Sequence, residues 1–152
     1  MINSRSNRRS IVLALVLAVA VPGAATLIHG QAAAPRAPMT DQAYAATMKQ
    51  IDSTFRSLRI NNKAMNHTDG ERDALRLARW FGDVERYWEA KRVKDAVDEA
   101  RIAIKAAEEI AGASKAMNMS TLESNEKTLS STCESCHKTH REMLTDGTYR
   151  IR

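Results

Sequence analysis

The sequence has no proline after Pro38, and it has few runs of β-branched residues. Proline interrupts helices, and alternating β-branched residues are typical of strands, so this part of the chain favours helices and predicts no strand. The sequence also has no glycine-rich phosphate loop, no serine nucleophile elbow and no His/Glu motif of metalloproteases. These absences exclude the common hydrolase and transferase motifs, and we do not expect the protein to be an enzyme.

Basic residues are only in slight excess once the N-terminus is set aside. The full chain has 23 Lys and Arg against 18 Asp and Glu, a net charge of +5. Arg5, Arg8 and Arg9 precede residue 33, which leaves 20 basic and 18 acidic side chains and a net charge of about +2. The sequence also has no run of lysine or arginine with interleaved aromatic residues. We therefore expect no nucleic-acid partner.

The N-terminus has the features of a secretory signal peptide. A basic start is followed by the unbroken apolar run 11–20 and then by small residues. This pattern predicts a signal peptide at residues 1–32, cleaved after Ala32, with a short linker at residues 33–39. We therefore expect the mature protein in the periplasm.

An uncleaved membrane anchor is the alternative interpretation of the same segment. Residues 11–28 are 18 in number, which is just long enough to span a bilayer. Pro22 and Gly23 interrupt this stretch. We expect the signal to be cleaved, and we expect no stable membrane span afterwards.

Four amphipathic segments follow the linker. In each of them apolar residues recur at steps of about three and four, which is the period of one helix face. The apolar stripes are Tyr44, Met48, Ile51, Phe55 and Leu58; Ala74, Leu77, Phe81, Val84 and Trp88; Val93, Val97, Ala100, Ile104, Ala107 and Ala111; and, with Glu126 among them, Leu122, Leu129, Cys133, Cys136, His140 and Met143. Four such helices with short connections predict an all-α fold, an antiparallel four-helix bundle.

Local signals predict where these helices begin and end. Thr68 to Glu71 and Ser120 to Glu123 fit capping boxes at the starts of the second and fourth helices. Gly147 is expected to close the fourth helix. The predicted bundle domain therefore covers residues 40–146, and residues 147–152 are expected to form a C-terminal tail.

Both cysteines of the chain lie in one motif, Cys133-Glu134-Ser135-Cys136-His137. C-x-x-C-H is the attachment pattern of a c-type haem, in which the two thiols bind the porphyrin and the imidazole coordinates the iron. The pattern predicts one covalent haem c on Cys133 and Cys136, with His137 as an iron ligand. A disulfide, a redox dithiol and a zinc site that includes His140 are the weaker alternatives.

A C-x-x-C-H near the C-terminus of an exported four-helix chain resembles the class II c-type cytochromes, which comprise cytochrome c prime and its low-spin relatives. The resemblance extends from about Asp41 to Arg141, and it is strongest in the segment from Cys133 to Arg141, where His140 replaces the usual aromatic residue. It implies that Arg141 lies near the proximal pocket or a haem propionate. It also implies a homodimer through the first two helices.

The second iron ligand is expected to come from another helix, because only 15 residues follow His137 and they lie on its side of the haem. The segment 46–51 is similar to the one that carries the axial methionine in the low-spin relatives, which implies Met48 as the ligand. Met48 also occupies an inward position of its helix stripe, and His/Met ligation raises the reduction potential. Ordinary core packing of Met48 and a bis-His site with His67 are the alternatives.

Two functions follow from these expectations, and Met48 distinguishes them. If Met48 binds the iron, the protein is a monohaem electron carrier whose partners are periplasmic redox proteins. If Met48 only packs nearby, the iron is five-coordinate, and the protein binds nitric oxide or carbon monoxide as cytochrome c prime does. A third hypothesis is a haem-free bundle that acts as an interaction module.

Overall fold

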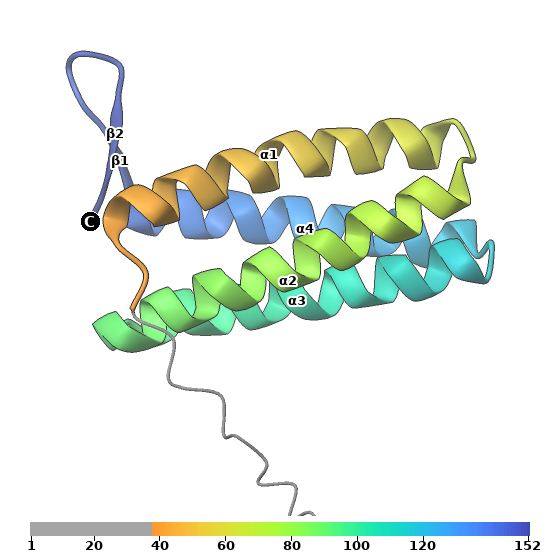
Figure 1. The fold of residues 1–152 in the computed structure, drawn as a ribbon, viewed down its shortest axis with the longest axis horizontal. Helices are drawn as coiled ribbons and strands as arrows, with labels where there is room; N and C mark the ends of the chain where they lie inside the picture. The colour runs from red at the N-terminus through yellow and green to blue at the C-terminus, as the bar shows by residue number, and fades with distance from the viewer. Residues whose placement is uncertain (1–37) are drawn as a thin grey trace, which may run out of the picture. The chain divides into compact units, whose positions relative to one another are not determined.

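The computed structural model describes residues 38–152, and it confirms the predicted all-α four-helix bundle (Figure 1). Consecutive helices run in opposite directions along the bundle. The helices are α1 (Asp41–Lys63), α2 (His67–Lys91), α3 (Lys94–Lys115) and α4 (Met119–His140), and the strands are β1 (Arg141–Met143) and β2 (Tyr149–Ile151). The predicted signal peptide and most of the predicted linker lie outside the described residues.

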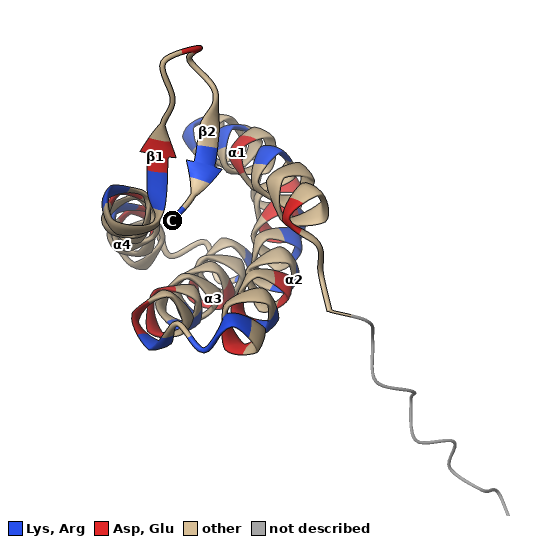
Figure 2. Ribbon diagram, turned by 90° about the vertical axis from the view of Figure 1, so that its left-hand side faces the viewer, with Lys and Arg blue, Asp and Glu red and all other residues tan. Residues whose placement is uncertain are grey.

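The helices pack in the order of the sequence. Helix α1 packs on α2, α2 on α3 and α3 on α4, whereas α1 and α4 do not form an extensive contact. Figure 2 shows the C-terminal hairpin between α1 and α4. None of the helices in residues 38–152 is long and apolar enough to cross a membrane.

The predicted apolar stripes of α1, α2 and α3 contribute to the core, whereas on α4 only Leu122 and Leu129 of the predicted stripe are buried. On α2 every stripe residue is buried, and on α1 Tyr44, Ile51 and Leu58 are buried while Met48 and Phe55 are partly buried. Helix α3 contributes mainly alanines; the buried ones are Ala96, Ala100, Ala103, Ala106, Ala107, Ala111 and Ala113. These small side chains let the backbones of α2 and α4 approach α3, which packs on both of them.

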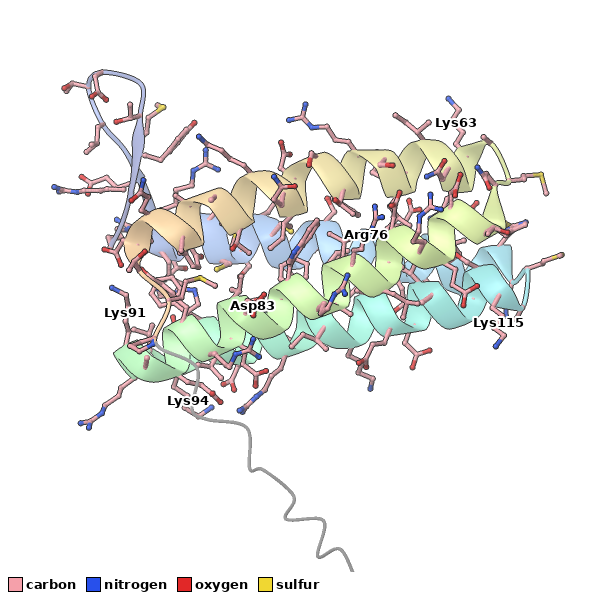
Figure 3. The ribbon with its side chains drawn as sticks, in the orientation of Figure 1. Lys63, Arg76, Asp83, Lys91, Lys94 and Lys115 are labelled. Atoms are coloured by element: carbon pink, nitrogen blue, oxygen red, sulfur yellow. The ribbon has the colours of Figure 1, made fainter. Side chains whose placement is uncertain are left out.

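The turns that follow α1 and α3 have the same sequence and the same backbone. Both read Lys-Ala-Met-Asn, and the methionines Met65 and Met117 are left-handed, with φ of 58° and 54°. The asparagines that follow, Asn66 and Asn118, cap the next helix by accepting a hydrogen bond from the backbone N–H three residues on. Figure 3 shows Lys63 and Lys115, the last residues of α1 and α3, at the same end of the bundle.

These asparagine caps correct two predictions. The capping boxes expected at Thr68 and Ser120 are wrong, because α2 and α4 both begin before those residues, at His67 and Met119. An asparagine side chain satisfies a free N–H of the first turn as well as a serine or threonine does. The repeated Lys-Ala-Met-Asn in the sequence could have indicated both asparagine caps.

The C-terminus also differs from the prediction. Helix α4 ends at His140, not near Gly147, and an antiparallel hairpin follows it. Gly147 lies in the hairpin turn with φ of 78°. Arg152 donates from its guanidinium to the carbonyls of Lys138 and Thr139 at 2.8 and 2.7 Å. The expected tail therefore includes β2 and returns to satisfy the last carbonyls of α4, which a helix end leaves without partners.

Candidate functional site

The C-x-x-C-H segment lies on the last turns of α4 and faces one small cavity. The spacing of three and four residues places Cys133, Cys136 and His137 on one helix face. Met48 reaches the same cavity from α1. The complete lining is Met48, Phe81, Val84, Ala96, Glu99, Ala100, Ala103, Thr132, Cys133, Cys136 and His137. Four residues predicted from the sequence, on helices far apart in the chain, are thus brought together.

The side chains of this lining fit a haem chemically. The cavity itself is too small for a haem, so the bundle would have to open to hold one. Two thiols, an imidazole and a thioether are the donors that a c-type haem with His/Met ligation uses, and the rest of the wall is largely apolar. The cavity has a volume of about 20 Å³, whereas cofactor pockets commonly have about 300 Å³ or more. A porphyrin would have to separate α1 from α4, which is the pair of neighbouring helices that lacks an extensive contact.

His137 has surroundings that favour a neutral imidazole. Burial against the protein on one side lowers its pKa from the ordinary value, and the nearby Arg141 guanidinium lowers it further. The Arg141 Nη1 atom lies 3.4 Å from His137 Nδ1. The neutral form of an imidazole is the one that binds metal ions.

Arg141 lies in β1, beside the predicted iron ligand. Its guanidinium also stacks over the ring of Tyr149 in β2, with 3.4 Å between the guanidinium carbon and the ring centroid. The hairpin therefore holds the Arg141 side chain against the His137 imidazole. A contact with a haem propionate stays a prediction.

The two cysteines are free thiols with little tendency to ionise. Burial raises the pKa of each to about 11, and neighbouring acidic groups add to the effect. Thiolates are the form that attacks disulfides and binds zinc. The structure therefore does not favour a reactive dithiol at Cys133 and Cys136.

Slow alkylation of these thiols is the expected chemical consequence. Folded protein without attached haem should react with iodoacetamide at pH 8 about 10- to 100-fold more slowly than the same chain in denaturant, since a pKa near 11 leaves about one thiol in a thousand ionised. The measurement is the rate of mass increase per cysteine. Equal rates in the folded and denatured chain would contradict the assignment of buried, protonated thiols.

Glu99 is a member of the site that the sequence analysis missed. It lines the cavity from α3, and the Ser135 hydroxyl donates to its Oε1 at 2.6 Å. This hydrogen bond joins the C-x-x-C segment to α3. A single glutamate on a helix resembles an ordinary solvated side chain, so no pattern in the sequence could have identified it.

His140 does not face the cavity. Its Nε2 lies 2.9 Å from Asp95 Oδ2, and its ring centroid lies 5.0 Å from that of Trp88. The alternative ligand His67 is also absent from the cavity lining, because it begins α2 at the opposite end of the bundle. Met143, which was expected in the apolar stripe of the fourth helix, is exposed on β1. Within residues 38–152, no three His, Cys, Asp or Glu side chains converge as a metal site.

Comparison with known proteins does not extend this description. No protein-family pattern, curated protein or solved structure matches the chain.

Proposed function

We propose that the chain is an exported monohaem c-type cytochrome that transfers electrons in the periplasm, a member of the class II c-type cytochromes. Cys133 and Cys136 would bind the haem covalently, and His137 and Met48 would ligate its iron. The single observation that carries this proposal is the cavity shared by these four side chains. When bound, the haem supplies a one-electron change between ferric and ferrous iron.

The residues around the cavity would hold this group in place. Burial and the nearby Arg141 guanidinium both lower the pKa of His137, which favours the neutral imidazole that binds metal ions. The Ser135–Glu99 hydrogen bond fixes the motif against α3. Phe81 and Val84, both buried on α2, exclude water from the wall beside Met48. If the ligands are held in place, their geometry changes little between oxidation states. This suits an electron carrier whose partners are periplasmic redox proteins, and we propose no catalytic reaction of its own.

Gas binding is the second candidate function, and it is favoured by the apolar wall formed by Phe81, Val84 and the alanines of α3. In this case Met48 would pack beside the iron without binding it, and nitric oxide or carbon monoxide would take the open position. The two functions share the haem attachment and differ only at Met48. We propose electron transfer, with Met48 bound to a low-spin iron, because Met48 lines the same cavity as His137.

Covalent attachment is the decisive test. Chain produced together with a cytochrome c assembly machinery should retain haem under denaturing conditions, and intact mass should increase by one haem. The double variant Cys133→Ala/Cys136→Ala should lose all covalent haem, because no other thiol exists in the sequence. Ser135→Ala, which keeps both thiols, is the matched control and should stay haem-loaded. A bare polypeptide mass in the wild-type chain would refute the proposed function.

A further inference from the structure

Polar contacts between helices in residues 38–152 join helices that are neighbours in the packing order, with one exception. The pairs are Asp41–Tyr87, Asp41–Lys91, Tyr44–Trp88, Ser57–Asp73 and Asn61–Asp73 between α1 and α2, Glu85–Arg101 and Glu89–Arg101 between α2 and α3, and Glu99–Ser135 and Asp95–His140 between α3 and α4. Within the described chain, the C-terminal hairpin hydrogen-bonds to no helix except α4. These contacts therefore tie α1 to α2, and they tie both α3 and the hairpin to α4.

The exception is the boundary between α1 and α4, which we call the seam. In the part of the chain that the structure describes, one hydrogen bond crosses the seam, from the Asn62 amide to Glu126 Oε1. Asn62 follows Met48 by 14 residues on α1, and Glu126 precedes Cys133 by seven residues on α4. The end of α1 that carries Asn62 lies opposite to the C-terminal hairpin (Figure 1). The seam is therefore fastened at the end of the bundle that is remote from the C-x-x-C-H motif.

This fastening includes polar atoms that have no partner. The side-chain oxygens of Asn62 and Ser114 are both buried and accept no hydrogen bond. They lie in one neighbourhood, because a Cβ atom at Gly70 would be 2.4 Å from the first oxygen and 3.4 Å from the second. A buried polar atom without a partner costs free energy that contact with water would offset. The closed seam therefore gains one hydrogen bond and carries the cost of two unpartnered oxygens.

The cavity is least enclosed on the side of the seam. Its apolar lining residues on α2 and α3 are all buried. In contrast, Met48 on α1 and Cys133 and Cys136 on α4 are partly exposed. Separation of α1 from α4 would widen the cavity between the methionine and the two thiols, and it would leave the packing of α2 on α3 unchanged.

We propose that the seam is the entry route for haem, and that the Asn62–Glu126 hydrogen bond is a latch that keeps it closed in the haem-free chain. In the open form α1 stays on α2 and α4 stays on α3, so the latch is the polar contact that breaks. Water then reaches the oxygens of Asn62 and Ser114, which lowers the free energy of the open form. The entry of haem rests on the proposed function, whereas the opening itself does not.

Alkylation of the two thiols in the haem-free chain measures this opening, because Cys133 and Cys136 react when the seam exposes them. Glu126→Ala removes the acceptor of the latch and leaves the buried Asn62 amide without a partner. The reaction with iodoacetamide at pH 8 should therefore become about fivefold faster. Glu126→Gln removes the same charge but keeps an acceptor oxygen, and it should react at the wild-type rate. Urea denaturation of each variant corrects its rate for global unfolding.

Two further variants test whether the effect belongs to the latch. Ser114→Ala removes one unpartnered oxygen from the closed seam and should slow alkylation about twofold. Arg101→Ala removes the ion pairs between α2 and α3 and should leave the rate unchanged. An unchanged rate in Glu126→Ala, or an equal rise in Glu126→Gln or Arg101→Ala, overturns the latch. If Glu126→Ala does not fold, slower alkylation of Ser114→Ala supports the latch and an unchanged rate overturns it.

Mixing of ferric protoporphyrin IX with the haem-free chain tests the entry route separately. Stopped-flow absorbance should show that haem associates with Glu126→Ala faster than with the wild-type chain, by the same factor as alkylation. Faster alkylation without faster haem association overturns the seam as the entry route. A wild-type chain that takes up no haem, even with the cytochrome c assembly machinery, refutes the proposed function instead, and alkylation still decides whether the latch exists.

Discussion

Replacement of Met48 by alanine is expected to convert the haem-loaded protein from a low-spin to a high-spin form. The thioether is the only methionine side chain in the cavity lining, so its loss leaves the iron without a sixth ligand from the protein. The reduction potential should fall as well, since methionine ligation raises it. The measurement is the ferric absorption spectrum, in which the methionine–iron charge-transfer band should disappear, together with a redox titration.

A second methionine provides the control for this experiment. Met119 at the start of α4 is partly buried like Met48, but it does not line the cavity. Met119→Ala should therefore keep the low-spin spectrum. If Met48→Ala keeps it too, the sixth ligand is another residue. A wild-type protein that is already high-spin would instead support the gas-binding alternative.

Replacement of Gly70 by alanine is expected to lower the free energy of unfolding by about 1–3 kcal/mol. A Cβ atom at this position of α2 would lie 2.4 Å from Asn62 Oδ1 and 3.4 Å from Ser114 Oγ. Asn62 cannot easily move away, because it is 2% exposed and its amide donates to Glu126 on α4. The added methyl group must break that contact or displace helix α2. Urea denaturation followed by circular dichroism measures the change.

Gly112 is the matched control for Gly70, because it also lies inside a helix but has no atom within 4 Å of an added Cβ. Gly112→Ala should raise the free energy of unfolding by about 0.5–1 kcal/mol, since alanine loses less backbone entropy in a helix. In an Asn62→Ala background, Gly70→Ala should no longer be destabilising, because the obstructing oxygen is gone. A similar loss in both backgrounds would contradict the close approach of Gly70 and Asn62.

The helices were predictable because their signals are local. The stripe from Ala74 to Trp88 has a helical period along one segment of chain, and every residue in it is buried. Helix ends were less predictable, since several residue types compete to cap each end. Asn66 prevailed over Thr68 at the start of α2. The hairpin escaped prediction because strands of three residues are too short to show an alternating pattern.

The candidate site was predictable in part for a similar reason. Cys133, Cys136 and His137 are neighbours in the sequence, so their spacing alone places them on one helix face. Glu99 and Asp95 could not be found in this way, because each contacts α4 from α3, at a separation of 36 or 45 residues. Partners of this kind depend on how two helices pack, and single-helix periodicity carries no such information.

The sequence by itself determined the four helices and the C-x-x-C-H face, because hydrophobic period and motif spacing act within one segment of chain. Only the tertiary structure decided that Met48 lines the same cavity as His137, that the alanine-rich α3 packs on both α2 and α4, and that Arg152 returns to the end of α4. These features depend on contacts between segments that are far apart in the chain. Such contacts form only when the whole bundle packs.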